Sequence, residues 1–506
     1  MNKLAKLDHQ FVWHPFTQMR DWLKREPVVI VAGNGAVLRD IRGREYLDAN
    51  SSIWTNLHGH NHPRINAAIQ RQLKKIAHSS ALGLANEPAS ILARELVTAT
   101  NPEICDLRHT IYESYAKSPR KSQIANRKLE KVFFSDNGST ALEVALKLAY
   151  EFTRRTRSAG SLPASHRRIE PRFLSLAGAY HGDTVGAVSL GHIDLFHKSY
   201  SGLLFKTDRV MSPYCYRCPF NRAKPERADA REYRKCSWEC VGLVEKKFTT
   251  QRRKGNPYAA FVFEPLIQGA AGMIPQPPGW LRQVTEIGRG HGALLIADEV
   301  MTGFGRTGFS HSTLNSQPST VLFACQHEGV QPDFLCLAKG LTGGYLPMAA
   351  TLTTQKVFDA FLGEYGDFKT FFHGHSYTAN QLGAAAALAS LDILQGKTSI
   401  YARQNLEKNL HDELQALWSL PNVGDIRQVG LIAGIELVRD WRSREPFDLR
   451  ERAGIRVCEA MARRGVLTRP VGNVIVLMPP YCTTKAQLQK IIRAVFDSIR
   501  EVLGKL

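Results

Sequence analysis

The chain lacks the features that would assign it to several large classes of protein. None of its apolar runs approaches the roughly 18 residues needed to span a bilayer, so we expect no contact with a membrane. The first ten residues, MNKLAKLDHQ, are not followed by an apolar core, which predicts a cytoplasmic protein without a signal peptide. At 506 residues, of which 43% are apolar and 22% charged, the composition indicates a globular protein of more than one domain.

Cysteine is scarce, and its number, nine, is odd. Few and unevenly spread cysteines argue against a disulfide framework and for reduced thiols. Four of them lie close together in the sequence: Cys215, Cys218, Cys236 and Cys240. Four thiolates in two close pairs could bind a zinc ion, and the alternative is a surface loop with free thiols. The loose spacing of the second pair favours the loop, so we expect no metal.

Acidic residues are fewer than basic ones. The chain has 46 Asp and Glu against 66 Lys and Arg, which gives a net charge of +20 and makes nucleic acid a candidate partner. The excess is concentrated in residues 108–131, 154–172 and 217–254, which lack regular apolar periodicity. No helix-turn-helix, RNP or basic-zipper pattern accompanies them. We therefore interpret the three segments as solvated surface loops and expect no nucleic acid partner.

Two apolar runs end in residues of opposite charge. The run from Phe334 to Ala338 is followed by Lys339, and the run from Ala293 to Ala297 is followed by Asp298. A desolvated lysine has a lowered pKa and can form a Schiff base with an aldehyde. A facing carboxylate would keep the ring nitrogen of pyridoxal phosphate protonated. The alternative is an ordinary buried ion pair at the edge of a sheet.

Three further apolar runs precede residues suited to bind a phosphate or a planar ring. Gly138 and Ser139 stand between a strand and a helix, where free backbone N–H groups bind anions, although serine is also a common helix cap. Tyr180 follows the next strand and could stack on a ring or simply pack in a turn. Glu264 ends a third strand. Ligands of parallel α/β sheets lie outside the carboxyl ends of the strands, so we expect these residues to meet there.

The repeated order of strand and helix predicts an α/β fold with a mostly parallel sheet. We assign this sheet to a large domain of residues 58–396. A hairpin is expected near the N-terminus, within residues 1–57, and residues 397–506 alternate between helices and strands as an α+β unit.

Three further residues are candidates for substrate contacts. Trp54 lies in a polar and aromatic loop that could form a wall of the substrate site. Arg469 follows a short strand and could anchor a carboxylate, or it could be a solvated arginine. Arg306, in a glycine-rich loop, could bind a carboxylate or a neighbouring chain.

Two motifs together resemble the class III pyridoxal-phosphate aminotransferases. They are DEVMTGFGR from Asp298 to Arg306 and AKGLTGG from Ala338 to Gly344. The similarity covers nearly the whole chain apart from the insertions. It implies pyridoxal 5′-phosphate as the cofactor and fold type I, with a small domain built from both termini. It also implies a homodimer with the cofactor at the subunit interface.

The resemblance assigns a role to each strand-end residue. Lys339 binds the cofactor covalently and moves protons, and Asp298 pairs with the ring nitrogen. Gly138 and Ser139 bind the phosphate, together with Ser376 from the partner subunit. Tyr180 stacks on the ring, and Glu264 lies in the same cofactor site.

Four further motifs narrow the resemblance to the branch that transaminates 8-amino-7-oxononanoate in biotin synthesis. They lie in residues 13–19, 50–54, 372–377 and 469–481. Trp54 and Arg469 then contact the substrates, with Phe16 and Gly374 in neighbouring motifs. Phe16 and Ile53 replace a Tyr and a Trp that are common where S-adenosylmethionine is the amino donor, so S-adenosylmethionine and lysine both stay open as donors.

Two alternatives to this function remain. The chain could be another class III aminotransferase that acts on ω-amino acids. It could also be a basic nucleic-acid-binding protein on an inactive aminotransferase scaffold, although the intact Asp298 and Lys339 argue against that.

Overall fold

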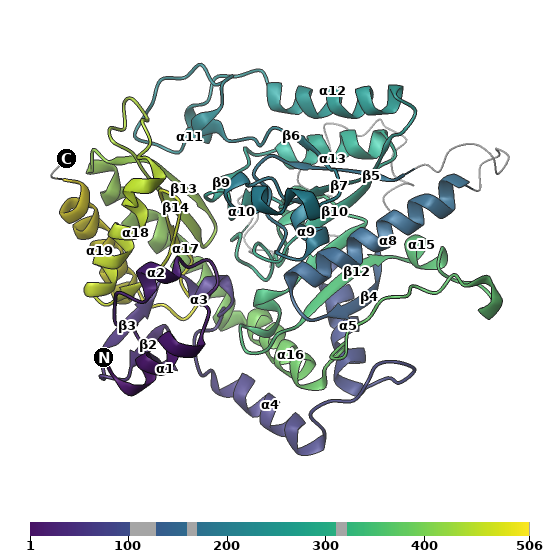
Figure 1. Cartoon of the computed structure of the whole chain (residues 1–506), viewed down its shortest axis with the longest axis horizontal. Coiled ribbons are helices and arrows are strands. Elements are labelled where there is room, and N and C mark those ends of the chain that lie inside the picture. Colours follow the sequence, from purple (N-terminus) through teal and green to yellow (C-terminus); the bar gives the residue numbers. More distant parts are fainter. Residues whose placement is uncertain (102–127, 159–169, 310–320, 505–506) are drawn as a thin grey trace.

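The structure is a computed structural model that describes residues 1–101, 128–158, 170–309 and 321–504 (Figure 1). Most of residues 108–131 and 154–172, the first two predicted surface loops, lie outside the described residues. Across the part of the chain that is described, no helix is both long and apolar enough to cross a membrane.

A seven-stranded sheet lies at the centre of the molecule, in the order β4-β12-β11-β10-β7-β5-β6. Its strands are β4 (Leu129–Ser135), β5 (Arg172–Leu176), β6 (Asp208–Val210), β7 (Tyr258–Phe263), β10 (Leu294–Asp298), β11 (Phe334–Leu337) and β12 (Ala349–Thr354). β12 runs antiparallel to the other six strands of this sheet. Every residue of β7 and β11 is buried, as expected for strands covered on both faces. The predicted mostly parallel sheet is confirmed, whereas β6 and β12 were not predicted.

Helices cover both faces of this sheet. α8 (Gly138–Ser158) packs on one face against Phe173, Val262 and Ile296. α5 (Glu87–Thr100), α12 (Glu239–Arg253) and α13 (Trp280–Gly290) belong to the core on the other face, with Phe261 and Leu295. The alternation of side chains along each strand therefore divides the core into two layers, one on each side of the sheet.

The remaining large-domain elements comprise further helices and two short strands. They are α4 (Pro63–Lys75), α9 (Val185–Leu190), α10 (Asp194–His197), α14 (Ala324–His327), α15 (Gln355–Asp359), α16 (Gln381–Gln395), β8 (Ile267–Gln268) and β9 (Ile274–Pro275).

The two ends of the chain lie side by side on one flank (Figure 1). β15 (Val466–Leu467) joins the N-terminal strands β1 (Ile30–Asn34), β2 (Val37–Asp40) and β3 (Glu45–Asp48), and it runs parallel to β3. A second small sheet contains β13 (Val423–Val429), β14 (Ile432–Leu437), β16 (Pro470–Val471) and β17 (Val474–Leu477). α17 (Lys397–Leu414), α18 (Ala453–Arg463) and α19 (Lys485–Leu503) complete this region. The exact domain limits of 1–57, 58–396 and 397–506 stay a prediction.

One interpretation of the sequence was wrong. Residues 217–254 were predicted as a solvated loop, but they contain α11 (Ala230–Tyr233) and α12. α12 buries Val244 and Phe248 in the core despite its many basic residues. The apolar residues are spaced at helical intervals, and the surrounding charges hid this periodicity. Two short N-terminal helices, α1 (Lys3–Phe11) and α2 (Met19–Trp22), were also not predicted.

Candidate active site

The carboxyl ends of the central strands open into one pocket of about 840 Å³. Eight of the residues selected from the sequence line it: Phe16, Trp54, Gly138, Ser139, Tyr180, Glu264, Asp298 and Lys339. They come from segments that are far apart in the sequence. Parallel strands bring their carboxyl ends to the same edge of a sheet, and this explains why the residues meet.

Three other candidates do not line this pocket. Gly374 and Ser376 are exposed, in the segment between α15 and α16, and do not line the pocket of their own chain, although His375 between them lies 3.1 Å from the pocket residue Asp136. Arg469 is exposed, and its Nη2 lies 3.4 Å from the carbonyl oxygen of Phe16. Because Phe16 itself lines the pocket, Arg469 stands beside its entrance rather than within it.

Lys339 stands at the turn that follows β11. Its φ of 44° is in the left-handed region that non-glycine residues rarely adopt, which indicates a strained backbone at this position. Loss of water lowers the pKa of its amine to about 8, although Asp298 and Glu264 oppose the shift. The Nζ atom lies 4.5 Å from the centre of a Trp54 ring. A larger fraction of this amine than of a solvated lysine is therefore neutral and nucleophilic near neutral pH.

Asp298 is buried and faces His181, with 2.7 Å between Asp298 Oδ2 and His181 Nδ1. Burial opposes protonation of His181, but the carboxylate outweighs it and raises the pKa of the imidazole. The other ring nitrogen of His181 has no hydrogen-bond partner among the described residues. Sequence reasoning missed His181, and its position directly after Tyr180 at a strand end was the signal that could have identified it.

The N-terminus of α8 opens onto the pocket at Gly138 and Ser139. A Cβ atom on Gly138 would lie 2.7 Å from Val300 Cγ1, so only glycine fits between the helix and this side chain. Ser139 Oγ accepts a hydrogen bond from the backbone of Asp183 at 3.2 Å. Free N–H groups at the start of a 21-residue helix provide a binding site for a phosphate.

Tyr180 and Glu264 lie next to one another in the pocket wall. The Tyr180 hydroxyl donates to Asp183 at 2.8 Å, and its ring lies parallel to that of His197 with 6.2 Å between centres. Burial raises the pKa of Glu264 to about 7. Its carboxyl oxygens accept hydrogen bonds from the backbone of Tyr180 at 3.3 Å and of Gly269 at 2.8 Å. Glu264 thus holds the backbone that presents Tyr180.

The predicted role of Arg306 was wrong. The side chain is only 1% exposed and donates to the Pro479 carbonyl and to Ser51 Oγ, each at 2.8 Å. It therefore binds neither a substrate carboxylate nor a neighbouring chain. Its glycine-rich surroundings suggested an exposed loop, but the small glycines allow this loop to pack deep in the molecule.

The four clustered cysteines give no support to the zinc alternative. Cys215, Cys218, Cys236 and Cys240 are all free thiols. Within the ranges that the structure describes, no group of three or more His, Cys, Asp or Glu side chains is placed to hold a metal ion. Burial raises the pKa of Cys215 to about 12 and that of Cys240 to about 11, which keeps both thiols protonated.

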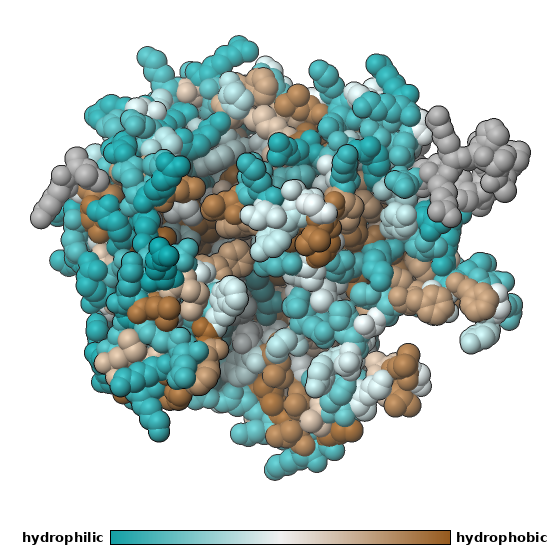
Figure 2. Space-filling view, viewed as in Figure 1, coloured by the Kyte–Doolittle hydropathy of each residue, from teal (hydrophilic) through white to brown (hydrophobic). Residues whose placement is uncertain are grey.

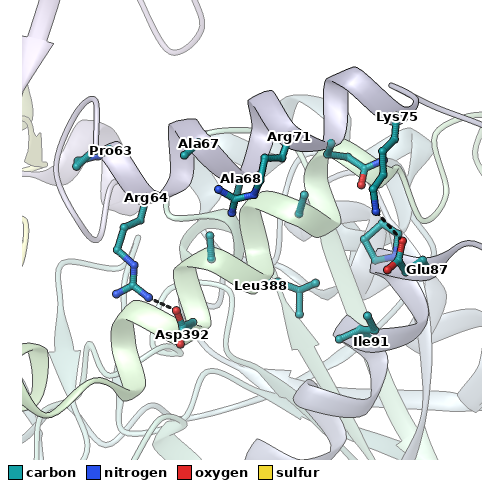
Figure 3. A pocket seen from close by; sticks show the side chains of 14 residues that line it. Pro63, Arg64, Ala67, Ala68, Arg71, Lys75, Glu87, Ile91, Leu388 and Asp392 are labelled. Carbon is teal, nitrogen blue, oxygen red and sulfur yellow. Dashed lines mark hydrogen bonds and ion pairs between the residues drawn. The ribbon is translucent and has the colours of Figure 1, made fainter.

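A second hollow of about 680 Å³ lies between α4, α5 and α16 (Figure 3). Alanine, leucine and isoleucine side chains line its floor, and ion pairs cross its rim. Lys75 Nζ lies 3.1 Å from Glu87 Oε2, and Arg64 pairs with Asp392. The charged residues of this hollow belong to helices, and none stands at the end of a strand of the central sheet. The pocket at Lys339 is therefore the candidate active site.

Comparison with known proteins agrees with this choice of site. The model of the family described as aminotransferase class III matches residues 19–499. This chain belongs to the class III aminotransferases. The family resemblance predicted from the two motifs is therefore confirmed.

Curated relatives extend over almost the whole chain. The adenosylmethionine-8-amino-7-oxononanoate aminotransferase of Geobacter sulfurreducens is 44% identical over 501 residues, which are 99% of this chain and 98% of that protein. The protein of the same name from Nitratidesulfovibrio vulgaris is 46% identical over 98% of this chain and 81% of its own length.

Solved structures of class III enzymes have the same fold. The crystal structure of adenosylmethionine-8-amino-7-oxononanoate aminotransferase from Methanocaldococcus jannaschii has a TM-score of 0.81, is 37% identical and covers 99% of each chain. An amine transaminase from an uncultivated Pseudomonas species, solved in its PLP-bound form, has a TM-score of 0.79 at 30% identity. It covers 97% of this chain and 98% of its own. The predicted fold type I is thereby confirmed.

Proposed function

We propose that this protein is a pyridoxal-phosphate-dependent aminotransferase that converts 8-amino-7-oxononanoate to 7,8-diaminononanoate in biotin synthesis. One observation carries the proposal: a lysine whose pKa is lowered to about 8 shares a pocket with a buried Asp298–His181 pair and a helix N-terminus. The names of the full-length relatives supply the substrate.

The residues present fit pyridoxal phosphate. When bound, the cofactor supplies an aldehyde for an amine and a ring that accepts electrons from the breaking bonds. Gly138 and Ser139 at the start of α8 would hold its phosphate, and Tyr180 would cover the ring. Asp298 would pair with the ring nitrogen. His181, 2.7 Å from Asp298, fixes the direction of that carboxylate.

Lys339 performs the proton transfers. Burial lowers the pKa of its Nζ to about 8, close enough to neutral pH for the amine both to accept and to donate a proton, as a general base and acid requires. It removes a proton from the carbon that carries the donor amino group and later returns one to the acceptor carbon. Two half-reactions on one lysine predict ping-pong kinetics.

Residues at the pocket entrance contact the substrates. Trp54 and Phe16 form apolar walls, and Phe16 packs edge-to-face on Phe196 with 5.3 Å between ring centres. Arg469, beside Phe16, is our candidate to bind the carboxylate of the oxo acid. S-adenosylmethionine, which the relatives' names contain, and lysine are the donors to compare.

We further propose a homodimer, in the cytoplasm, whose two pockets are completed across the interface. Aromatic and aliphatic side chains are exposed on the protruding segments after α4 and between α15 and α16, as Figure 2 shows. Leu82 is 91% exposed, Tyr365 93% and Phe372 73%. Such exposure favours burial against a second copy. The segment between α15 and α16 also carries Gly374 and Ser376, which we assign to the pocket of the other subunit.

Loss of the Lys339 amine tests the proposed chemistry. Lys339→Ala should remove turnover with every donor, because the residue that binds the cofactor covalently and moves protons is gone. Lys356→Ala, which removes an exposed lysine of α15, is the control and should retain activity. Turnover by the Lys339 variant at the wild-type rate would end the proposal.

A donor screen with 8-amino-7-oxononanoate as the acceptor then tests the substrate. Formation of 7,8-diaminononanoate with S-adenosylmethionine or lysine supports the assignment. Transfer only to simple aldehydes or ketones would instead favour another class III aminotransferase, such as the amine transaminase to which the chain is similar.

A further inference from the structure

The loop that carries Trp54 has a backbone conformation that residues other than glycine rarely adopt. Four consecutive residues, which form the short element α3 (Ser51–Trp54), have φ values of 46°, 46°, 65° and 70°, and none of them is glycine. A left-handed turn brings the Cβ of each L-residue close to the following carbonyl oxygen and is disfavoured at every position. Such strain persists only where the surrounding structure holds it, and it is concentrated at functional sites.

The turn brings Trp54 against the candidate lysine. A Trp54 ring lies 4.5 Å from Lys339 Nζ, and Ile53 and Thr55 line the same pocket. Trp54 also packs against the apolar cluster that contains Ile267 and Met301. In a right-handed turn the side chains of residues 52–54 would point in other directions. The left-handed geometry therefore decides which groups face the pocket.

One set of contacts holds the start of the turn. The Ser51 hydroxyl donates to the Met478 carbonyl at 2.6 Å and accepts from Arg306 Nη2 at 2.8 Å. The same guanidinium donates to the Pro479 carbonyl and lies 4.7 Å from the centre of the Tyr481 ring. Arg306 thus ties the turn to the loop that follows Asp298 and to the segment after β17.

A second set of contacts holds the middle of the left-handed turn. Asp48, at the end of β3 and only 3% exposed, accepts hydrogen bonds from the backbone of Ser52 at 3.1 Å and from its hydroxyl at 2.9 Å. It also accepts from the backbone of Asn50 at 3.2 Å, and His60 Nε2 lies 2.9 Å away. Several hydrogen bonds to one carboxylate over so few residues favour a single backbone conformation.

We propose that Arg306 and Asp48 are positioning residues that hold residues 51–54 in a left-handed turn and thereby fix the Trp54 wall of the substrate site. The proposal rests on the proposed function only in taking this pocket as the place where the amine and the oxo acid bind. Lys339 and Asp298 are positioned by β11 and β10 of the central sheet rather than by this turn. A loosened turn should therefore weaken substrate binding while the chemical step proceeds.

Ser51→Ala removes the hydrogen bond between Arg306 and the turn without creating the large cavity that truncation of the buried arginine would leave. We expect the KM for the working donor to rise about tenfold while kcat stays within about twofold, the signature of lost binding that is equal in the ground and transition states. The visible absorbance of the bound cofactor should not change. Ser498→Ala, which removes a buried hydroxyl from the distant helix α19, is the matched control and should leave the KM unchanged.

Rescue by glycine separates a held turn from ordinary packing. Ser52 is exposed and does not line the pocket, and glycine adopts a left-handed conformation without strain. In the double variant Ser51→Ala/Ser52→Gly we expect the KM to return to within about threefold of the wild-type value.

A measurement that needs no turnover separates this proposal from the proposed function. Amide hydrogen exchange of the peptide that contains residues 50–57 should be faster in Ser51→Ala apoprotein and slower again in the double variant. The proposal stands if the KM and the exchange rate both rise in the single variant and both return in the double variant. A fall in kcat at constant KM, or a double variant that is not rescued, would overturn it. A wild-type protein that transfers no amino group would overturn the proposed function instead.

Discussion

The buried ionisable side chains around Arg427 and those around Lys339 have their hydrogen-bonding needs met differently. The Arg427 guanidinium, fully buried in β13, donates to Glu436 at 2.6 Å, to Asp425 at 3.0 Å and to the Tyr214 hydroxyl at 2.8 Å. Its Nε and Nη2 both donate to the carbonyl of Gly272. Every side-chain nitrogen of this arginine has a partner within the chain, although Asp425 Oδ1 has none among the described residues.

The Lys339 cluster is incomplete by the same measure. The Lys339 amine lies 4.5 Å from the centre of a Trp54 ring, and within the residues that the structure describes His181 Nε2 and Trp54 Nε1 are buried with no hydrogen-bond partner. Buried polar groups are nearly always paired, so unpaired ones around a pocket indicate that a ligand completes them. The comparison teaches that buried charge alone does not identify a site, whereas unmet bonding capacity beside a pocket does.

Asp298→Asn should give the largest effect on activity. The amide cannot keep a ring nitrogen protonated or favour a charged His181, and we expect kcat/KM to fall about a thousandfold. The free energy of unfolding should change far less than in a variant of Arg427. Steady-state kinetics and urea unfolding on the same preparation measure both effects, and activity near the wild-type level would contradict the assigned role.

Arg427→Met should lower the stability of the fold much more than the activity. Glu436 and Asp425 would stay buried without their cation, and we expect the free energy of unfolding to fall by about 3–5 kcal/mol. Activity per folded molecule should stay within about threefold, because the cluster does not line the pocket. Arg493→Met, on the exposed face of α19, is the control and should unfold like the wild type. Equal loss of activity and stability would remove the distinction between the two clusters.

Gly138→Ala should give an intermediate effect confined to the cofactor. The new methyl group would lie 2.7 Å from Val300 Cγ1, and overpacking of this kind costs about 1–3 kcal/mol. We expect the affinity for pyridoxal phosphate, measured by titration of the apoprotein, to fall about tenfold or more. Adding Val300→Ala should restore most of it. A double variant no better than the single one would show that the phosphate does not bind at this helix.

The pH dependence of cofactor binding should show the smallest effect. Only the neutral amine of Lys339 reacts with an aldehyde, and burial lowers its pKa from 10.5 to about 8. The rate at which apoprotein binds the cofactor covalently should therefore rise with pH and level off above about 8. The same shift means that charging Lys339 destabilises the fold below pH 8, a cost that disappears above its unfolded pKa. A midpoint near 10 would show a solvated lysine.

The sequence predicted those parts of the site that follow from strand order. Lys339, Asp298, Tyr180 and Glu264 each follow an apolar run, and parallel strands must bring such residues to one edge of the sheet. β12 was missed because its sequence, AATLTT, contains three threonines and no strong apolar pattern, and only its place between β4 and β11 makes it a strand.

Other parts could not be predicted because they depend on contacts distant in sequence. The left-handed turn at residues 51–54 contains no glycine, and its geometry results from hydrogen bonds to Arg306, Met478 and Asp48. The burial of Arg306 depends on a carbonyl more than 170 residues later, at Pro479. Local sequence patterns carry no information about partners of that kind.

Covalent trapping tests the central claim most directly. The protein loaded with pyridoxal phosphate would be reduced with borohydride and digested, and the modified peptide would be identified by mass spectrometry. Our account predicts one stoichiometric pyridoxyl group, on Lys339, and none in Lys339→Ala. A pyridoxyl group on a different lysine, or no modification of the loaded wild-type protein, would contradict it.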